Sequence, residues 1–191
     1  SNPLIWRRVI IPADVTFKRL HDTIQFSMDW WDRHLYEFEF PQEKLRITND
    51  GETYEEFKFY QKKYKDKALT KRNDPHGMIA HILETTIRQP QTLKIDRYLE
   101  KYKTITYVYD FGDNWQHKIE LEKIIDDYEF GYPTILEGDG ACPPEDVGGI
   151  PGYEEFLRVW NDQEDAEHEE MRQWGENQYY RPFDIAFRNN L

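Results

Sequence analysis

The chain has 191 residues, of which 32% are charged and 16% are aromatic. A chain of this length buries roughly 70% of the surface that its unfolded form exposes, so its core needs no disulfide or metal. The aromatic content argues against an intrinsically disordered protein. No apolar run approaches the roughly 18 residues of a membrane-spanning helix, and the N-terminus lacks a signal-peptide pattern. Because no such run is present, we expect a soluble protein that makes no membrane contact. The lone cysteine, Cys142, has no partner for a disulfide, which is typical of a cytoplasmic protein.

The formal net charge of −12 is unevenly spread along the chain. Residues 1–128 carry 21 basic and 22 acidic side chains, whereas residues 129–191 carry 4 basic and 15 acidic ones. An acidic C-terminal third repels nucleic acid and anionic membranes over long distances. We therefore expect the partner to be a protein or a small ligand.

One local run, residues 58–72, is basic and has aromatic side chains between its cations. Cations interleaved with aromatic rings are typical of single-stranded nucleic-acid sites. The candidate residues for such a site are Lys58, Lys62, Lys63, Lys65 and Lys67. Charge runs are more often solvated helix faces, so the sequence disfavours nucleic-acid binding.

The hydrophobic pattern of the first 102 residues predicts a mixture of strands and helices. The opening segment predicts a strand at 5–11, a helix at 16–29, a strand at 34–40 and a short strand at 44–48, before the Asn49–Asp50–Gly51 turn signal. Residues 52–70 are compatible with either a helix or a strand, and we assign a helix. A helix at 78–87 follows, which Pro90 ends, and then a connector at 93–102 with at most a single helical turn.

A long hairpin is predicted at 103–125, with strands at 103–109 and 115–125. A four-residue loop would mix apolar and polar residues on each face, whereas the five-residue loop 110–114 keeps the faces separate. The five-residue loop pairs Tyr109 with Trp115, Tyr107 with His117 and Ile105 with Ile119. This register places His117 on the buried face and Asp110 on the polar face.

The C-terminal part is expected to hold a long loop and three helices. Residues 126–152 contain many glycines and prolines, which predicts irregular structure, and loops this long are often functional. An amphipathic helix follows at 153–160, then an acidic helix at 165–174 and a short helix at 183–191. Without repeats or linkers, residues 1–191 are expected to form one α+β domain. Its mixed, mostly antiparallel sheet would be packed by the N-terminal and C-terminal helices.

Three segments resemble the plasmid pRiA4b ORF-three-like family: residues 5–9 (IWRRV), 107–117 (YVYDFGDNWQH) and 142–149 (CPPEDVGG), the last followed by Gly152 and Tyr153. The resemblance implies a compact α+β domain found in prokaryotic and mobile-element contexts. It implies no activity, cofactor or functional residue. Members usually carry a further strand before the opening motif, and only four residues precede Ile5 here.

The carboxylates of the two later motifs are the first candidate site. Clustered carboxylates beside an imidazole can bind a divalent ion and activate water. The candidates are Asp110, Asp113, Glu145 and Asp146, with His117. The predicted register separates His117 from Asp110, and short polar side chains in a tight loop often bond to nearby amides. We therefore expect no bound metal and no cofactor.

Gly148 and Gly149 allow a close backbone approach, so their loop could cradle a ligand or clamp the following helix, and the sequence leaves both open. Cys142 could pair with His117 or His34 as nucleophile and base, although a lone cysteine before two prolines more often serves packing.

The preferred hypothesis is a non-catalytic binding or interaction module. Its ligand-binding candidates are Asp110, Asp113, Glu145, Asp146, Gly148 and Gly149. One alternative is a metal-dependent hydrolase that uses the loop carboxylates. The other is single-stranded nucleic-acid binding through residues 58–72.

Overall fold

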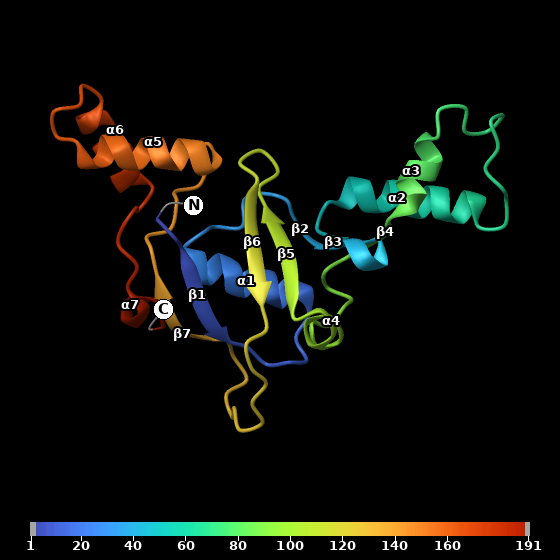
Figure 1. Cartoon of the computed structure of the whole chain (residues 1–191), viewed down its shortest axis with the longest axis horizontal. Coiled ribbons are helices and arrows are strands. Elements are labelled where there is room, and N and C mark those ends of the chain that lie inside the picture. Colours follow the sequence, from blue (N-terminus) through green and yellow to red (C-terminus); the bar gives the residue numbers. More distant parts are fainter. Residues whose placement is uncertain (1–2, 190–191) are drawn as a thin grey trace.

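The computed structural model describes residues 3–189, and its strands and helices are interspersed along the chain up to β7, after which three helices follow (Figure 1). The helices are α1 (Phe17–Met28), α2 (Gly51–Tyr64), α3 (Met78–Glu84), α4 (Asp96–Tyr102), α5 (Gly149–Asn161), α6 (His168–Asn177) and α7 (Ile185–Asn189), with one 3-10 turn, η1 (Pro41–Glu43). The strands are β1 (Trp6–Ile10), β2 (Tyr36–Phe40), β3 (Leu45–Thr48), β4 (Thr86–Arg88), β5 (Thr104–Tyr109), β6 (Trp115–Glu120) and β7 (Thr134–Asp139).

The strands form two sheets. The larger sheet has the order β4-β3-β2-β5-β6, and all its neighbours are antiparallel except the parallel pair β3 and β4. The smaller sheet is the antiparallel pair of β1 and β7. Helix α1 packs against the larger sheet (Figure 1). This arrangement confirms the predicted α+β class with a mostly antiparallel sheet.

The core between α1 and the larger sheet is built from aromatic rings. Phe17 of α1 lies with its ring centroid 4.9 Å from that of Phe38 on β2, and Phe38 lies 4.8 Å from Tyr107 on β5. All three side chains are fully buried. Aromatic pairs at such separations add to the stabilisation from apolar burial, which accounts for the high aromatic content of the chain.

The predicted hairpin register is confirmed. Tyr109 pairs with Trp115 and Tyr107 with His117, across the five-residue loop 110–114. The His117 ring packs against Tyr107 and lies edge-on to buried Trp30, with centroids 5.3 Å apart in both pairs. Burial lowers the pKa of His117 to about 4. The second strand is shorter than predicted and ends at Glu120.

Two predicted irregular segments are wrong because tertiary contacts order them. Within 126–152, β7 forms by pairing with β1. A Cβ on Gly138 would lie 2.9 Å from the backbone oxygen of Trp6, so this glycine permits close strand approach. The connector at 93–102 holds more than the single turn expected, since it contains the seven-residue helix α4, which packs on the core through Leu99.

The helix predicted at 78–87 is also wrong in its second half. It ends at Glu84, and β4 follows in parallel pairing with β3. Ile87 is buried in this strand, so β-branched residues at 85–87 support sheet pairing more than helical periodicity.

Several helix boundaries differ from the predicted ones. Helix α2 ends at Tyr64, before the predicted residue 70, and α6 spans 168–177 where 165–174 was predicted. Helix α5 begins four residues early because Pro151 is tolerated in a first turn. Helix α7 falls within 183–191, of which Asn190 and Leu191 lie outside the described residues. Within residues 3–189, none of the helices combines the length and apolar character needed to cross a membrane.

Candidate functional site

The hairpin loop 110–114 and the loop 142–149 meet in space. The Gly148 N–H donates to Asp113 Oδ2 over 3.1 Å. A Cβ on Gly149 would lie 2.5 Å from the backbone oxygen of Asp113, and both glycines have positive φ values of 92° and 67°. Only glycine fits this conformation without strain. The glycine pair therefore holds the start of α5 against the hairpin loop.

Asp110 does not lie on the solvent face, so that expectation is wrong. Asp110 is only 8% exposed, and its backbone N–H donates to the Leu35 carbonyl over 2.9 Å. The segment before β2 covers Asp110 because β2 pairs with β5 in antiparallel register. Oδ1 of Asp110 accepts the Gly112 N–H over 2.9 Å, which fixes the carboxylate within the turn.

Asp110 and Asp146 converge on a residue that the sequence did not place there, His34. The Nε2 atom of His34 lies 3.7 Å from Asp110 Oδ2 and 3.3 Å from Asp146 Oδ1. The register between β2 and β5 carries the signal for this contact. Because Tyr36 pairs with Tyr109, residues just before β2 must lie beside residues just after β5.

Glu145 and Asp113 are held elsewhere. Glu145 is buried, and its Oε1 accepts the Tyr109 hydroxyl over 2.5 Å and the Trp31 N–H over 3.3 Å. Burial, reinforced by Glu145, raises the pKa of Tyr109. Asp113 accepts the Gly148 N–H. The four predicted carboxylates thus separate into one converging pair and two that hold loops.

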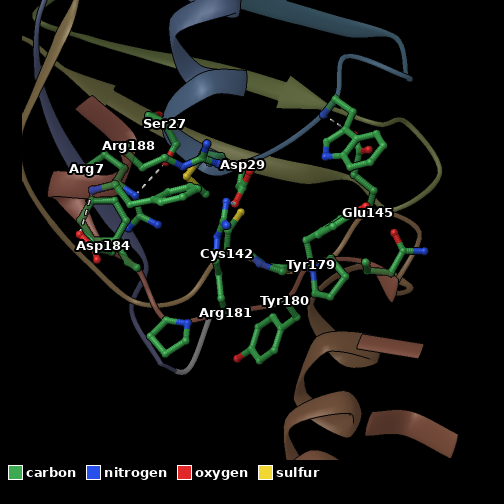
Figure 2. A pocket seen from close by; sticks show the side chains of 18 residues that line it. Arg7, Ser27, Asp29, Cys142, Glu145, Tyr179, Tyr180, Arg181, Asp184 and Arg188 are labelled. Atoms are coloured by element: carbon green, nitrogen blue, oxygen red, sulfur yellow. Dashed lines mark hydrogen bonds and ion pairs between the residues drawn. The ribbon is translucent and has the colours of Figure 1, made fainter. Parts of the chain in front are cut away.

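A small pocket contains three arginines, Asp29 and Cys142 (Figure 2). The Arg181 guanidinium donates to Asp29 Oδ2 over 2.7 Å, and Arg188 forms an ion pair with the same carboxylate. Arg7 donates to the backbone oxygens of Ser27, Trp6, Asp139 and Gly140. The cavity volume of about 40 Å³ is about that of a single water molecule.

This arginine pocket is therefore a polar contact between the N-terminal strand and the C-terminal segment. Burial raises the pKa of the Cys142 thiol, although the nearby Arg7 opposes the shift. A thiol that stays protonated is a poor nucleophile.

A larger cleft shares the lining residues 180–183 with the arginine pocket. Its volume is about 560 Å³, within the range of small-molecule sites. Residues from β7, α5, α6 and the C-terminal segment form it, and its lining includes the side chains of Trp160, Tyr180, Phe183, Arg172 and Arg181. Sequence reasoning missed this cleft because its walls come from segments that are far apart in the chain.

The comparisons with known proteins place the chain in a family. The family profile described as plasmid pRiA4b ORF-3-like protein matches residues 1–189. The chain belongs to the plasmid pRiA4b ORF-3-like family. The resemblance read from the three sequence motifs is thereby confirmed.

Two relatives of this pRiA4b ORF-3-like chain cover most of its length. It is 32% identical over 173 residues to the uncharacterized protein y4hQ of Sinorhizobium fredii (strain NBRC 101917 / NGR234), covering 91% of this chain and 74% of the relative. It is similar to the crystal structure of MM3350, a protein of unknown function from Methanosarcina mazei Go1. The TM-score is 0.70, the two sequences are 34% identical, and the match covers 97% of this chain and 90% of that chain. Neither name carries an activity.

The basic run of this pRiA4b ORF-3-like chain lies far from its acidic helices. Lys58, Lys62 and Lys63 are on α2, and Lys65 and Lys67 follow its end. Figure 1 shows α2 at the opposite end of the molecule from α5 and α6. Repulsion from the acidic third is therefore weaker at this patch than the sequence implied. Phe59 in this run is 58% exposed, and its neighbours Tyr60 and Tyr64 are half-buried.

Proposed function

We propose that this protein is a non-catalytic binding module and that the cleft between α5, α6 and the segment 180–183 is its ligand site. The ligand class is a small molecule that combines a flat apolar body with an anionic group such as a carboxylate or a phosphate. One observation carries the proposal: a cleft of about 560 Å³ is lined by aromatic rings and by two arginines.

The aromatic wall is rigid, which favours binding. The Trp160 ring packs edge-on against Tyr180 at 5.0 Å and lies 5.3 Å from Phe156. Helix α6 approaches it closely, since a Cβ on Gly175 would lie 2.5 Å from the Trp160 ring. A wall held by such packing loses little conformational entropy when a flat ligand stacks on it. The wall therefore suits an aromatic or otherwise flat ligand.

The two arginines supply the charge that an anionic group needs. Arg172 lies 3.9 Å from the Trp160 ring centroid and donates to Glu176 over 3.2 Å. Arg181 donates to Asp29 over 2.7 Å. A guanidinium has five N–H donors, so each of these arginines keeps donors for a ligand oxygen. Residues 129–191 hold only four basic side chains, and two of them line this cleft.

The chemistry of the lining supports binding over catalysis. Besides the two arginines, the polar lining residues include Asp139 and Asn161, and among the described residues histidine, cysteine, serine and lysine are missing from the lining. Histidine is the most frequent general base, and cysteine and serine are the most frequent nucleophiles, so the Asp139 carboxylate has neither an imidazole nor such a nucleophile beside it in this lining. Neither of the two described cavities is lined by Asp110 or Asp146, which the hydrolase alternative needs beside its substrate.

The test is a fluorescence titration with 8-anilinonaphthalene-1-sulfonate, which joins flat rings to an anionic group. We expect one saturable site, with competition from 1-naphthoate and 1-naphthyl phosphate. Arg172→Gln should weaken binding by at least about tenfold, because a hydrogen bond to a charged group is lost. Arg158→Gln is the matched control, since Arg158 lies on α5 and pairs with Glu155 and Asp165 on the surface.

Two results would contradict the proposal. One is an absence of saturable binding by folded protein. The other is binding that Arg172→Gln and Arg158→Gln weaken equally, because such binding would not depend on the cleft.

A further inference from the structure

We propose that His34, Asp110 and Asp146 form a binding site for one divalent transition-metal ion, with Zn²⁺ as the best fit. The site lies outside the cleft and does not depend on the proposed ligand-binding function. The expectation of a metal-free protein rested on carboxylates that point to different faces. The fold instead brings two of them to His34, which that reasoning did not include.

The separations of the three ligand atoms suit metal coordination. One nitrogen or oxygen atom from each side chain lies within 4.8 Å of the other two. His34 Nε2 is 3.3 Å from Asp146 Oδ1 and 3.7 Å from Asp110 Oδ2. Ligands bound at about 2.1 Å around a tetrahedral ion lie about 3.4 Å from one another. An ion between these three atoms therefore needs only small side-chain rotations.

The His34 nitrogen is an orphan in this arrangement. Nε2 of His34 is buried, and among residues 3–189 no hydrogen-bond partner satisfies it. A buried nitrogen without a hydrogen bond is unfavourable, and the two carboxylate oxygens beside it repel each other. A cation among the three atoms would coordinate the nitrogen and would replace the repulsion between the two carboxylates with attraction to the ion.

The surroundings hold the ligands in place, as the second shell of a metal site does. Oδ1 of Asp110 is bonded to the Gly112 N–H, which leaves Oδ2 directed at His34. The His34 ring lies edge-on to Tyr109, with centroids 5.7 Å apart. The Asp146 side chain is 62% exposed, so an ion can enter from solvent.

The donor set selects the metal. One imidazole with two carboxylates suits Zn²⁺ and, less well, Mn²⁺, whereas Mg²⁺ prefers oxygen ligands alone. Three protein ligands leave a coordination position for water. Such an ion would join the segment before β2, the hairpin loop and the loop before α5.

A second cluster in the same protein, His21 with Asp22 and Asp32, is a useful contrast. Both nitrogens of His21 are already bonded, Nδ1 to the Tyr107 hydroxyl at 2.8 Å and Nε2 to Asp32 at 2.7 Å. His21 is fully buried and offers no free lone pair. We therefore assign the metal site to the cluster of His34, Asp110 and Asp146 and not to the cluster around His21.

The test is isothermal titration calorimetry of the full chain, freed of metal by chelation, with ZnCl₂ and with MgCl₂. We expect one Zn²⁺ per chain and no comparable Mg²⁺ binding. Asp146→Asn changes an exposed side chain and should fold, yet should weaken Zn²⁺ binding at least about tenfold. His34→Phe keeps the ring packing and should weaken it more than about 100-fold.

The matched control is His81→Ala. The His81 side chain is 86% exposed and lies 4.0 Å from Glu84, so it represents an adventitious surface site. Zn²⁺ should also shift the imidazole NMR signals of His34, and not those of His81. The proposal is overturned if folded protein binds no Zn²⁺, or if the His34→Phe variant binds Zn²⁺ as tightly as the wild type does; loss of binding in His81→Ala would then place the ion at that surface site.

Discussion

Replacing Gly149 by alanine is the sharpest test of how the two motif loops are joined. Gly149 has a φ of 67°, and a left-handed conformation costs an L-residue about 1–2 kcal/mol. The new Cβ would lie 2.5 Å from the backbone oxygen of Asp113, so backbone must move on one side. That movement also weakens the Gly148 hydrogen bond to Asp113, which is worth about 1 kcal/mol.

These contributions give a loss of about 3 kcal/mol in the free energy of unfolding for Gly149→Ala, or about 6–12 °C in Tm for a chain of this size. Gly148→Ala is the matched control. Gly148 has a φ of 92°, yet a Cβ there meets its nearest neighbour at 3.6 Å, so only the strain of about 1–2 kcal/mol remains. Gly131→Ala meets nothing within 4 Å and should change stability by less than about 0.5 kcal/mol.

The assay is urea unfolding followed by tryptophan fluorescence for the wild type and the three variants. The expected order of destabilisation is Gly149→Ala, then Gly148→Ala, then Gly131→Ala, with unchanged m-values. The reasoning is refuted if Gly149→Ala costs no more than Gly148→Ala. In that case the contact with Asp113 would contribute nothing beyond backbone strain.

Three further predictions concern the core and the basic run. Burial lowers the pKa of His117 to about 4, so between about pH 4 and pH 6.5 the folded protein binds fewer protons than the unfolded chain. The free energy of unfolding should therefore be highest above about pH 6.5 and fall by up to about 3 kcal/mol as the pH drops to 4. Urea unfolding at several pH values should show a smaller pH dependence for His117→Gln. Tyr107→Phe should cost about 1–3 kcal/mol in the same assay, because it removes the hydroxyl bonded to buried His21; a neutral effect would show that bond to be dispensable. Fluorescence anisotropy should detect no micromolar binding of single-stranded oligonucleotides at physiological salt, since α2 also carries three glutamates. Salt-sensitive micromolar binding that Lys62→Glu with Lys63→Glu abolishes would instead identify a nucleic-acid site.

The features predictable from the sequence are those that depend on neighbouring residues. The apolar stripe of α1 and the alternation of apolar and polar residues in the hairpin each reflect one local period. The hairpin register followed because a one-residue slip would expose Tyr107 and Tyr109. The motifs around the hairpin loop and Cys142 were enough to recognise the family, since they are local strings of residues.

Other features were decided only when distant segments met. The residues of β4 have a helical period, and only the open edge of β3 beside them makes a strand the better state. The glycines near β7 favour a loop until β1 supplies a partner. Pairing energy with a distant strand is invisible to a local pattern, which explains both wrong predictions.

The same limit applies to the candidate sites. The carboxylates of Asp110 and Asp146 could be picked out by residue type, but their directions depend on a turn and a loop that only packing fixes. His34 stands 76 positions from Asp110 in the chain and reaches it through the pairing of β2 with β5. The arginine-lined cleft likewise draws its walls from four segments. The sequence determined which chemical groups the protein has, and the tertiary structure decided which of them lie within reach of one another, because contacts across the chain depend on the whole fold.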